Sequence, residues 1–140
     1  MKPKLVDIKK VVHLLQEQCP FIIFAIISGI DEEGRLNLID NVELFVLLET
    51  SIGIFFALEK ILPVMTVLVP EALCDVTLLN KVDVITRFHA SNSRCLFIGN
   101  GKEQSYRQFV QRARLDYRIF KAQYRLNGSV DFFERIPDCR

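Results

Sequence analysis

Two short apolar runs constrain the fold of this chain more than any other feature of its sequence. FIIFAIIS at residues 21–28 and VELFVLL at residues 42–48 are rich in β-branched and aromatic residues and have the length of a strand. Runs of this kind are typical of strands that are buried on both faces of a sheet. The segment between them contains Gly29, Gly34 and Asn37, which favour turns. The sequence therefore predicts two neighbouring central strands joined by a loop.

Apolar residues at three- and four-residue spacing predict helices in other parts of the chain. The expected helices cover residues 4–18, 50–62, 81–90 and 102–125, and further strands are expected at 74–80 and 94–99. Strands that alternate with helices favour an α/β (α+β) fold, in which helices pack on a mixed β-sheet, here with a long C-terminal helix. With 140 residues, the chain is expected to form a single domain over residues 1–140.

The limits of the second helix depend on one proline. Thr50 or Ser51 is expected to cap its beginning, and Pro63 is expected to end it because proline lacks a backbone N–H. Its packing side is expected to consist of Ile52, Phe55, Phe56, Ile61 and Leu62. Residues 64–69 fit either an added strand or an extension of the helix.

At the C-terminal end of the chain, Asn127-Gly128 is expected to end the last helix, and residues 129–140 are expected to form a short docking tail.

Charge and composition exclude several classes of protein. The formal net charge is +1, half of the residues are hydrophobic and 25% are charged, which predicts a soluble globule without an overall attraction to nucleic acid or to an anionic membrane. The longest apolar stretch is interrupted by Glu59, Lys60 and Pro63, so no membrane span is expected. The four cysteines are widely separated, and the N-terminus has no signal-type apolar stretch. We therefore expect a cytoplasmic protein with reduced thiols.

The expected long helix carries two stripes of side chains. Its apolar stripe, at three- and four-residue steps, consists of Tyr106, Phe109, Val110, Ala113, Tyr117, Phe120 and Tyr124. A basic stripe, whose members return to nearly the same angle at ~100° per residue, consists of Arg107, Arg114, Arg118, Lys121 and Arg125. Such a stripe is most often a solvated face, but next to aromatic residues it also suits an acidic protein partner or RNA phosphates. Of these ligands, we expect a protein partner.

Acidic residues gather in and after the loop between the first two strands. They are Asp31, Glu32, Glu33, Asp40 and Glu43, and they are either part of a metal site or the solvated side chains of a loop. For Asp31, Glu32 and Glu33 the solvated loop is the favoured interpretation. Glu43, like Asp75, lies inside a buried-strand pattern, where a carboxylate is costly unless it is paired or near the end of the sheet. For these two acids a site role and a structural role are weighed equally.

The order of elements, with several residues in them, resembles the minimal nucleotidyltransferase family, whose members are small relatives of the polymerase-β-type enzymes. In that family a first strand ends in Gly-Ser, the next strand opens with Asp-x-Asp, and a later strand brings a third acid. Here Gly29 stands at the motif glycine, Asn41-Val42-Glu43-Leu44 occupies the Asp-x-Asp-Leu position, and Asp75 in CDVTLLN is the third acid. The resemblance covers about residues 5–125. It implies a nucleotidyltransferase-like fold.

The resemblance also implies a site for ATP and Mg²⁺. Glu43 and Asp75 match the catalytic and metal-binding acids, and Gly29, Ile30 and Asn41 match the nucleotide-binding positions. The sequence departs from the family because Ile30 replaces the phosphate-binding serine, Asn41 replaces the first acid, and Glu43 is one methylene longer than aspartate. Mg²⁺ prefers carboxylate oxygens in a strict octahedral geometry. We therefore expect that this degenerate active site has little or no activity.

Two hypotheses of function follow. By resemblance, the chain is a nucleotidyltransferase-like component of a prokaryotic toxin–antitoxin pair, whose intact relatives transfer AMP from ATP to a tyrosine of a HEPN-type toxin. In that case it uses Mg²⁺ and ATP. Alternatively, it is a binding or adaptor module without a cofactor that docks to a protein partner through the basic helix or the open end of the sheet. A homo-oligomer is compatible with both hypotheses.

Overall fold

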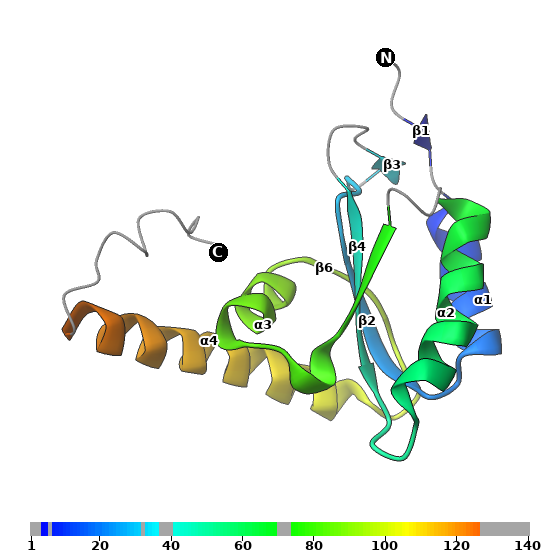
Figure 1. Cartoon of the computed structure of the whole chain (residues 1–140). Coiled ribbons are helices and arrows are strands. Elements are labelled where there is room, and N and C mark those ends of the chain that lie inside the picture. The colour runs from blue at the N-terminus through cyan, green and yellow to red at the C-terminus, as the bar shows by residue number, and fades with distance from the viewer. Residues whose placement is uncertain (1–3, 6, 32, 37–40, 70–73, 127–140) are drawn as a thin grey trace.

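Figure 1 shows the computed structural model, which describes residues 4–5, 7–31, 33–36, 41–69 and 74–126. The middle layer is a sheet of four strands, which are β2 (Ile22–Ser28), β4 (Val42–Leu48), β5 (Cys74–Leu78) and β6 (Arg94–Ile98). Their order across the sheet is β5-β4-β2-β6. β4 and β5 run parallel, whereas β2 is antiparallel to both β4 and β6. The sheet is therefore mixed, as predicted.

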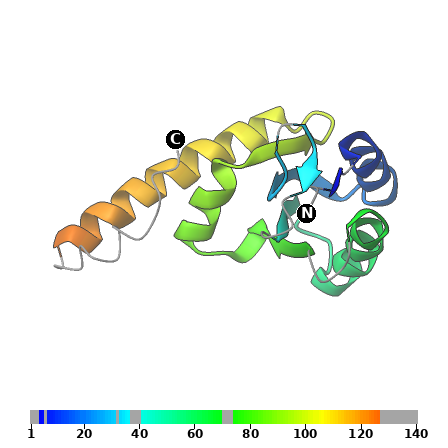
Figure 2. The ribbon, with the colours of Figure 1, turned by 90° about the horizontal axis from the view of Figure 1, so that it is seen from above.

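Helices cover both faces of this sheet. α1 (Ile8–Gln18) and α2 (Ile54–Leu68) lie on one face, and α3 (Val84–Ser91) and α4 (Glu103–Leu126) lie on the other (Figures 1 and 2). α4 has 24 residues, and its C-terminal part extends past the sheet and α3. The predicted α+β class with a long C-terminal helix is confirmed. Among the described residues, no helix combines the length and apolarity that crossing a membrane requires.

The two apolar runs form the centre of the sheet. Ile27 and Leu44 are register partners whose side chains belong to the apolar cluster under α1 and α2. Ile26 and Phe45, the next pair, belong to the cluster under α3 and α4. All four side chains are at most 1% exposed. Both strands are thus buried on both faces, and the prediction of neighbouring central strands is confirmed.

The first helix is shorter than predicted. Lys4–Leu5 forms a short strand, β1, which pairs antiparallel with Arg35–Leu36, β3, in the loop between β2 and β4. α1 begins at Ile8 because Asp7 caps it: the backbone N–H of Lys10 donates to Asp7 Oδ1 at 3.1 Å. The prediction of a helix from residue 4 was wrong, since a side-chain cap and a non-local strand pairing set its start.

The second helix differs from the prediction at both ends. α2 begins after Gly53, not at Thr50 or Ser51, and continues through Pro63 to Leu68. The missing N–H and the ring of a proline cost a helix up to about 3 kcal/mol, but Val64 and Met65 beyond it are at most 3% exposed. Their burial offsets the cost of the proline. Residues 64–68 are therefore an extension of the helix.

The packing side of α2 was predicted correctly only in part, since Ile61 is buried and Ile52, just before the helix, packs against the apolar cluster. Its buried residues are Ala57, Ile61, Val64 and Met65. Phe55 and Phe56, which were expected to pack, are 83% and 51% exposed. The helical period that begins at Gly53 turns the small Ala57 to the core and Phe55 to the solvent. Phe56 lies at the edge of the packed side, with its ring centroid 5.8 Å from that of Phe21.

The remaining elements follow the predicted order with shifted limits. β5 stops at Leu78, and a 3₁₀ turn over Leu79–Lys81 separates it from α3. α3 begins at Val84 because Asp83 Oδ1 accepts a hydrogen bond from the backbone N–H of Thr86 at 2.7 Å. Residues 127–140, with the predicted helix end and docking tail, lie outside the described residues.

Candidate functional site

Glu43 and Asp75 lie side by side on neighbouring strands. Each is the second residue of its strand, and the two are register partners in the parallel β4–β5 pair. Partners in a ladder project from the same face, which is the face of Phe45 and hence of α3 and α4. Glu43 is half-buried and Asp75 is exposed, because both lie near the end of the sheet. The structure brings the two acids together, while their catalytic and metal-binding roles stay predictions.

Two residues with hydroxyl groups lie next to these acids, and the sequence analysis did not predict either of them as part of the site. Thr77 Oγ1 donates a hydrogen bond to Glu43 Oε2 at 3.0 Å. Ser28, the last residue of β2, is the register partner of Glu43 on its other side. The two-residue period of a strand, which puts Thr77 on the same face as Asp75, could have found the threonine. We refer to Ser28, Glu43, Asp75 and Thr77 as the strand-end cluster.

The three predicted nucleotide-binding residues lie in different surroundings. Gly29 has a positive φ of 90°, and a Cβ there would lie 2.5 Å from the carbonyl oxygen of Asn41. Only glycine allows the loop to approach Asn41 so closely. The side chain of Asn41 is exposed, whereas that of Ile30 packs against the apolar cluster under α1 and α2. Gly29 and Asn41 are thus adjacent near the strand-end cluster, while Ile30 contributes to the core.

The acids of the loop have structural contacts. Asp31 Oδ1 accepts hydrogen bonds from the backbone N–H groups of Glu33 and Arg35 at 2.9 and 2.8 Å. The carboxylate of Glu33 pairs with the Arg35 guanidinium at 3.0 Å, and both side chains are largely exposed. Such bonds are typical of a turn that an aspartate organises. For Asp31 and Glu33 the solvated-loop interpretation fits these contacts, and Glu32 and Asp40 lie outside the described residues.

The strand-end cluster does not fit a pair of magnesium ions. Within the described residues, no group of three or more histidine, cysteine, aspartate or glutamate side chains is placed to hold a metal ion. One oxygen of Glu43 already accepts the Thr77 hydroxyl, and Asn41 offers a neutral amide in place of a carboxylate. Mg²⁺ requires near-ideal octahedral coordination by oxygens and binds mainly through carboxylates and phosphates. The described donors fall short of what two such ions need.

The cysteine next to this cluster is a poor nucleophile. Cys74 precedes Asp75 and is buried. Burial, together with the negative charge of Asp75, raises the pKa of the Cys74 thiol to about 11. Burial likewise raises the pKa of Cys19 to about 11 and that of Cys95 above its ordinary value. Since the thiolate is the reactive form, these three cysteines are structural.

The predicted basic stripe lies along the outer surface of α4. Lys121 is half-exposed, and the exposed members are Arg107, Arg114, Arg118 and Arg125. None of these four arginines forms an ion pair with another residue in the described part of the chain. Leu115 and Ile119 on the same helix are 48% and 47% exposed. The outer surface of α4 therefore combines unpaired positive charge with exposed apolar side chains.

The comparisons with known proteins bear on the fold. No protein-family model matches the chain, and the search of curated proteins gives no match. Solved structures do match, at low sequence identity. A toxin–antitoxin structure with AMP-PNP matches with a TM-score of 0.65 and 14% identity, over 86% of this chain and 94% of that chain.

Two further structures give the same result. The toxin–antitoxin MntA–HepT matches with a TM-score of 0.61 and 13% identity, over 85% of this chain and 91% of that chain. A tri-AMPylated HEPN toxin of Shewanella oneidensis in complex with MNT antitoxin matches with a TM-score of 0.61 and 12% identity, over 85% and 90% of the two chains. Identities this low establish the fold alone. The chain has the fold of the minimal nucleotidyltransferase antitoxins.

Proposed function

We propose that this protein is the binding component of a toxin–antitoxin pair and that it acts by docking to a HEPN-type helical partner rather than by transferring AMP. The fold, shared with antitoxins that are solved in complex with HEPN toxins, supports a partner of this kind. The outer surface of α4 is the observation that carries the proposal. The proposed compartment is the cytoplasm.

The chemistry of α4 suits a protein interface. Arg114 and Arg118 lie one turn apart and repel each other unless an opposite charge offsets them. Leu115 and Ile119, the next residues along the helix, are 48% and 47% exposed, and burial of this surface against a partner would add a hydrophobic contribution. Arginine is one of the residue types that contribute most to binding at interfaces. An acidic surface with apolar residues at its centre would complement this helix.

Charge reversal tests the proposal. In Arg114→Glu/Arg118→Glu, the affinity for a HEPN-type helical partner should fall by about tenfold or more at low salt. The affinity of the unchanged protein should also fall steeply as salt rises, because exposed charges are screened. Isothermal calorimetry over a salt series measures both effects.

The matched control reverses two charges on the other side of the molecule. Lys9 and Lys10 on α1 are exposed, and Lys9→Glu/Lys10→Glu changes the net charge by the same amount. This variant should keep its affinity. If the α4 variant stays folded and binds the partner as tightly as the unchanged protein does, α4 is only a solvated face. The interface would then lie at the sheet edge or on α1.

A second candidate function, weak nucleotidyl transfer with Mg²⁺ and ATP, is favoured by one observation. Glu43 and Asp75 are register partners on one face, as the catalytic acids of the related fold would require. Calorimetry with Mg-ATP distinguishes the candidates. Affinity in the micromolar range, a free energy of about 8 kcal/mol, that is lost in Glu43→Gln/Asp75→Asn would support catalysis and contradict the binding-only function. We expect no measurable binding.

A further inference from the structure

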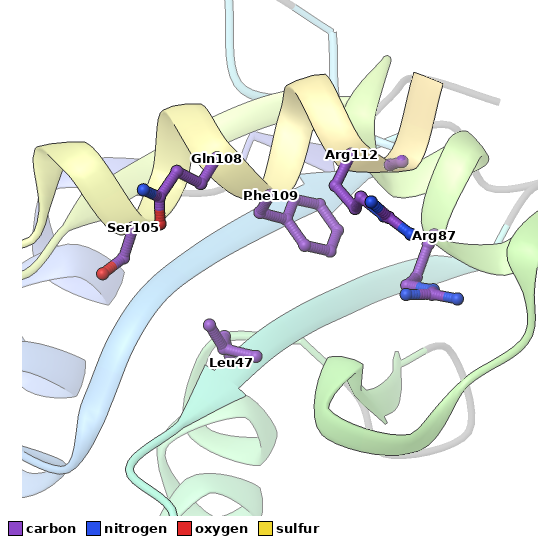
Figure 3. Close-up of a pocket in the computed structure, with 7 residues that line it drawn as sticks. Leu47, Arg87, Ser105, Gln108, Phe109 and Arg112 are labelled. Carbon is purple, nitrogen blue, oxygen red and sulfur yellow. The ribbon is translucent and has the colours of Figure 1, made fainter. Parts of the chain in front are cut away.

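A cavity between α3, α4 and the end of β4 lies apart from the strand-end cluster (Figure 3). Its volume is about 370 Å³, toward the lower end of the range for small-molecule sites. Leu47, Phe109 and Ala113 line it with apolar surface. Leu47 is four residues beyond Glu43 on β4, roughly 13 Å along a strand. The cavity is therefore a separate site on the same face of the sheet.

The two charged groups that line the cavity are both positive. Arg87 from α3 and Arg112 from α4 lie together at one end, and Ser105 and Gln108 lie toward the other end (Figure 3). No aspartate or glutamate is among the described residues that line it. Two guanidinium groups that face one small space repel each other. A further anion, beside the Asp116 carboxylate that lies against both groups, would offset the remaining repulsion.

Asp116 on α4 holds the two arginines but leaves part of their hydrogen-bonding capacity unused. Arg112 Nε lies 3.0 and 3.2 Å from the two carboxylate oxygens of Asp116. The Arg87 Nη1 atom is 4.0 Å from the same carboxylate, which is too long for a hydrogen bond. Arg87 Nε is buried and has no hydrogen-bond partner among the described residues. Asp116 thus positions both groups, and neither guanidinium is saturated.

We propose that this cavity binds a small organic carboxylate with an apolar body. The two arginines and Asp116 give a local net charge of +2 − 1 = +1, which a single carboxylate neutralises. A phosphate monoester, with about −1.5 to −2 charges at neutral pH, would exceed it. Asp83 is also near Arg87, but its carboxylate is engaged at the N-terminus of α3.

The shape of the cavity agrees with this class of ligand. A planar guanidinium matches the two oxygens of a carboxylate, so the acid head would lie at Arg87 and Arg112. The apolar body would lie against Leu47 and Phe109. Ser105 could then hydrogen-bond a polar group at the far end of the ligand.

Binding of 3-phenylpropionate to the full chain tests the proposal. In ¹H–¹⁵N spectra, the amides of Leu47 and Ala113 should shift in a saturable way. The neutral 3-phenylpropionamide and the short acetate should each bind at least about tenfold more weakly, since the amide lacks the charge and acetate lacks the apolar body. Phenyl phosphate should bind no better than the carboxylate. The absence of saturable shifts, equal binding of the amide, or tighter binding of phenyl phosphate would overturn the proposal.

Matched variants test the role of the two arginines. Arg87→Gln and Arg112→Gln should each weaken 3-phenylpropionate binding by about tenfold, the loss expected for a charge-assisted hydrogen bond. Lys9→Gln, at an exposed position of α1, removes an equal charge outside the cavity and should bind like the unchanged protein. Arg112 is largely exposed, so its variant should fold even where Arg87→Gln does not. If Arg112→Gln binds unchanged, the arginines only clamp α3 to α4 and the proposal fails.

Discussion

The two faces of the sheet differ in how completely they are packed. Toward α1 and α2, the alternate β4 residues Val42, Leu44 and Val46 are all fully buried in one continuous apolar cluster. Toward α3 and α4, only Phe45 of the β4 residues on that face is fully buried. Glu43 and Leu47, on either side of it, are half-buried. One face therefore consists of close-packed apolar side chains, while the other keeps polar groups and space.

The difference shows where a small domain has room for binding. Close packing of apolar side chains stabilises a fold but leaves no volume for a ligand. The face under α3 and α4 has instead one smaller apolar cluster, the strand-end cluster and the cavity with Arg87 and Arg112. All the candidate sites except α4's own outer surface lie on this face. The predictions below test how much stability the face nevertheless supplies.

The largest effect is expected at Phe45, where the looser face still has a core. Phe45→Ala should lower the free energy of unfolding by about 3–5 kcal/mol, because the side chain is fully buried under α3 and α4. Phe55→Ala on α2 is the matched control, since Phe55 is 83% exposed, and it should change stability by less than about 0.5 kcal/mol. Urea unfolding measures both. A similar loss in the free energy of unfolding for the two variants would show that Phe45 is not part of a stabilising core.

A smaller effect is expected at the loop that leads from β2 toward the strand-end cluster. Gly29→Ala should cost at least about 2 kcal/mol, from the strain of a positive φ and from a clash with the Asn41 carbonyl. Gly101 has a φ of 74°, but no atom lies within 4 Å of an added Cβ. Gly101→Ala should therefore cost only the strain, about 1 kcal/mol. Thermal unfolding measures the loss of stability in both variants. Equal losses would show that the loop at Gly29 moves to relieve the clash.

The next largest effect on stability is expected at Asp83, which caps the N-terminus of α3. The hydrogen bond from the Thr86 N–H lowers the pKa of the Asp83 carboxyl below its ordinary value of 3.8. A lowered pKa in the folded state means that the stabilisation is present above pH 3.8 and is lost as the pH falls through the folded-state pKa. Asp83→Ala should cost about 1 kcal/mol at neutral pH, and less in acid. Asp83→Asn, which can still cap, should keep most of the stability and lose its pH dependence, and unfolding at several pH values tests this.

The smallest effect is expected inside the strand-end cluster. Thr77→Val removes the donor to Glu43 Oε2 and should cost about 0.5–1 kcal/mol, because water reaches the half-buried carboxylate and replaces part of the bond. Glu43→Gln keeps an acceptor for Thr77 and should cost less. Chemical unfolding of the two variants gives the order. A larger loss in Glu43→Gln would show that the charge itself stabilises this end of the sheet.

The elements that the sequence predicted well are those with a strong local pattern. The runs at residues 21–28 and 42–48 became β2 and β4, and the long apolar period after residue 102 became α4. Limits were predicted less well, because a cap at Asp7 and a pairing between β1 and β3 decided where α1 begins. Pro63 was overestimated as a helix end, because the penalty of a proline is local while the burial of Val64 and Met65 depends on the sheet.

The sequence by itself predicted the strands, the helices and the basic stripe of α4, because side-chain period and propensity act within a few residues along the chain. Only the tertiary structure decided that Glu43 and Asp75 are register partners with Thr77 beside them. It also decided that Arg87 and Arg112, from different helices, share one cavity. These groups are joined by strand register and helix packing, and such contacts between distant segments leave no periodic signal in the sequence.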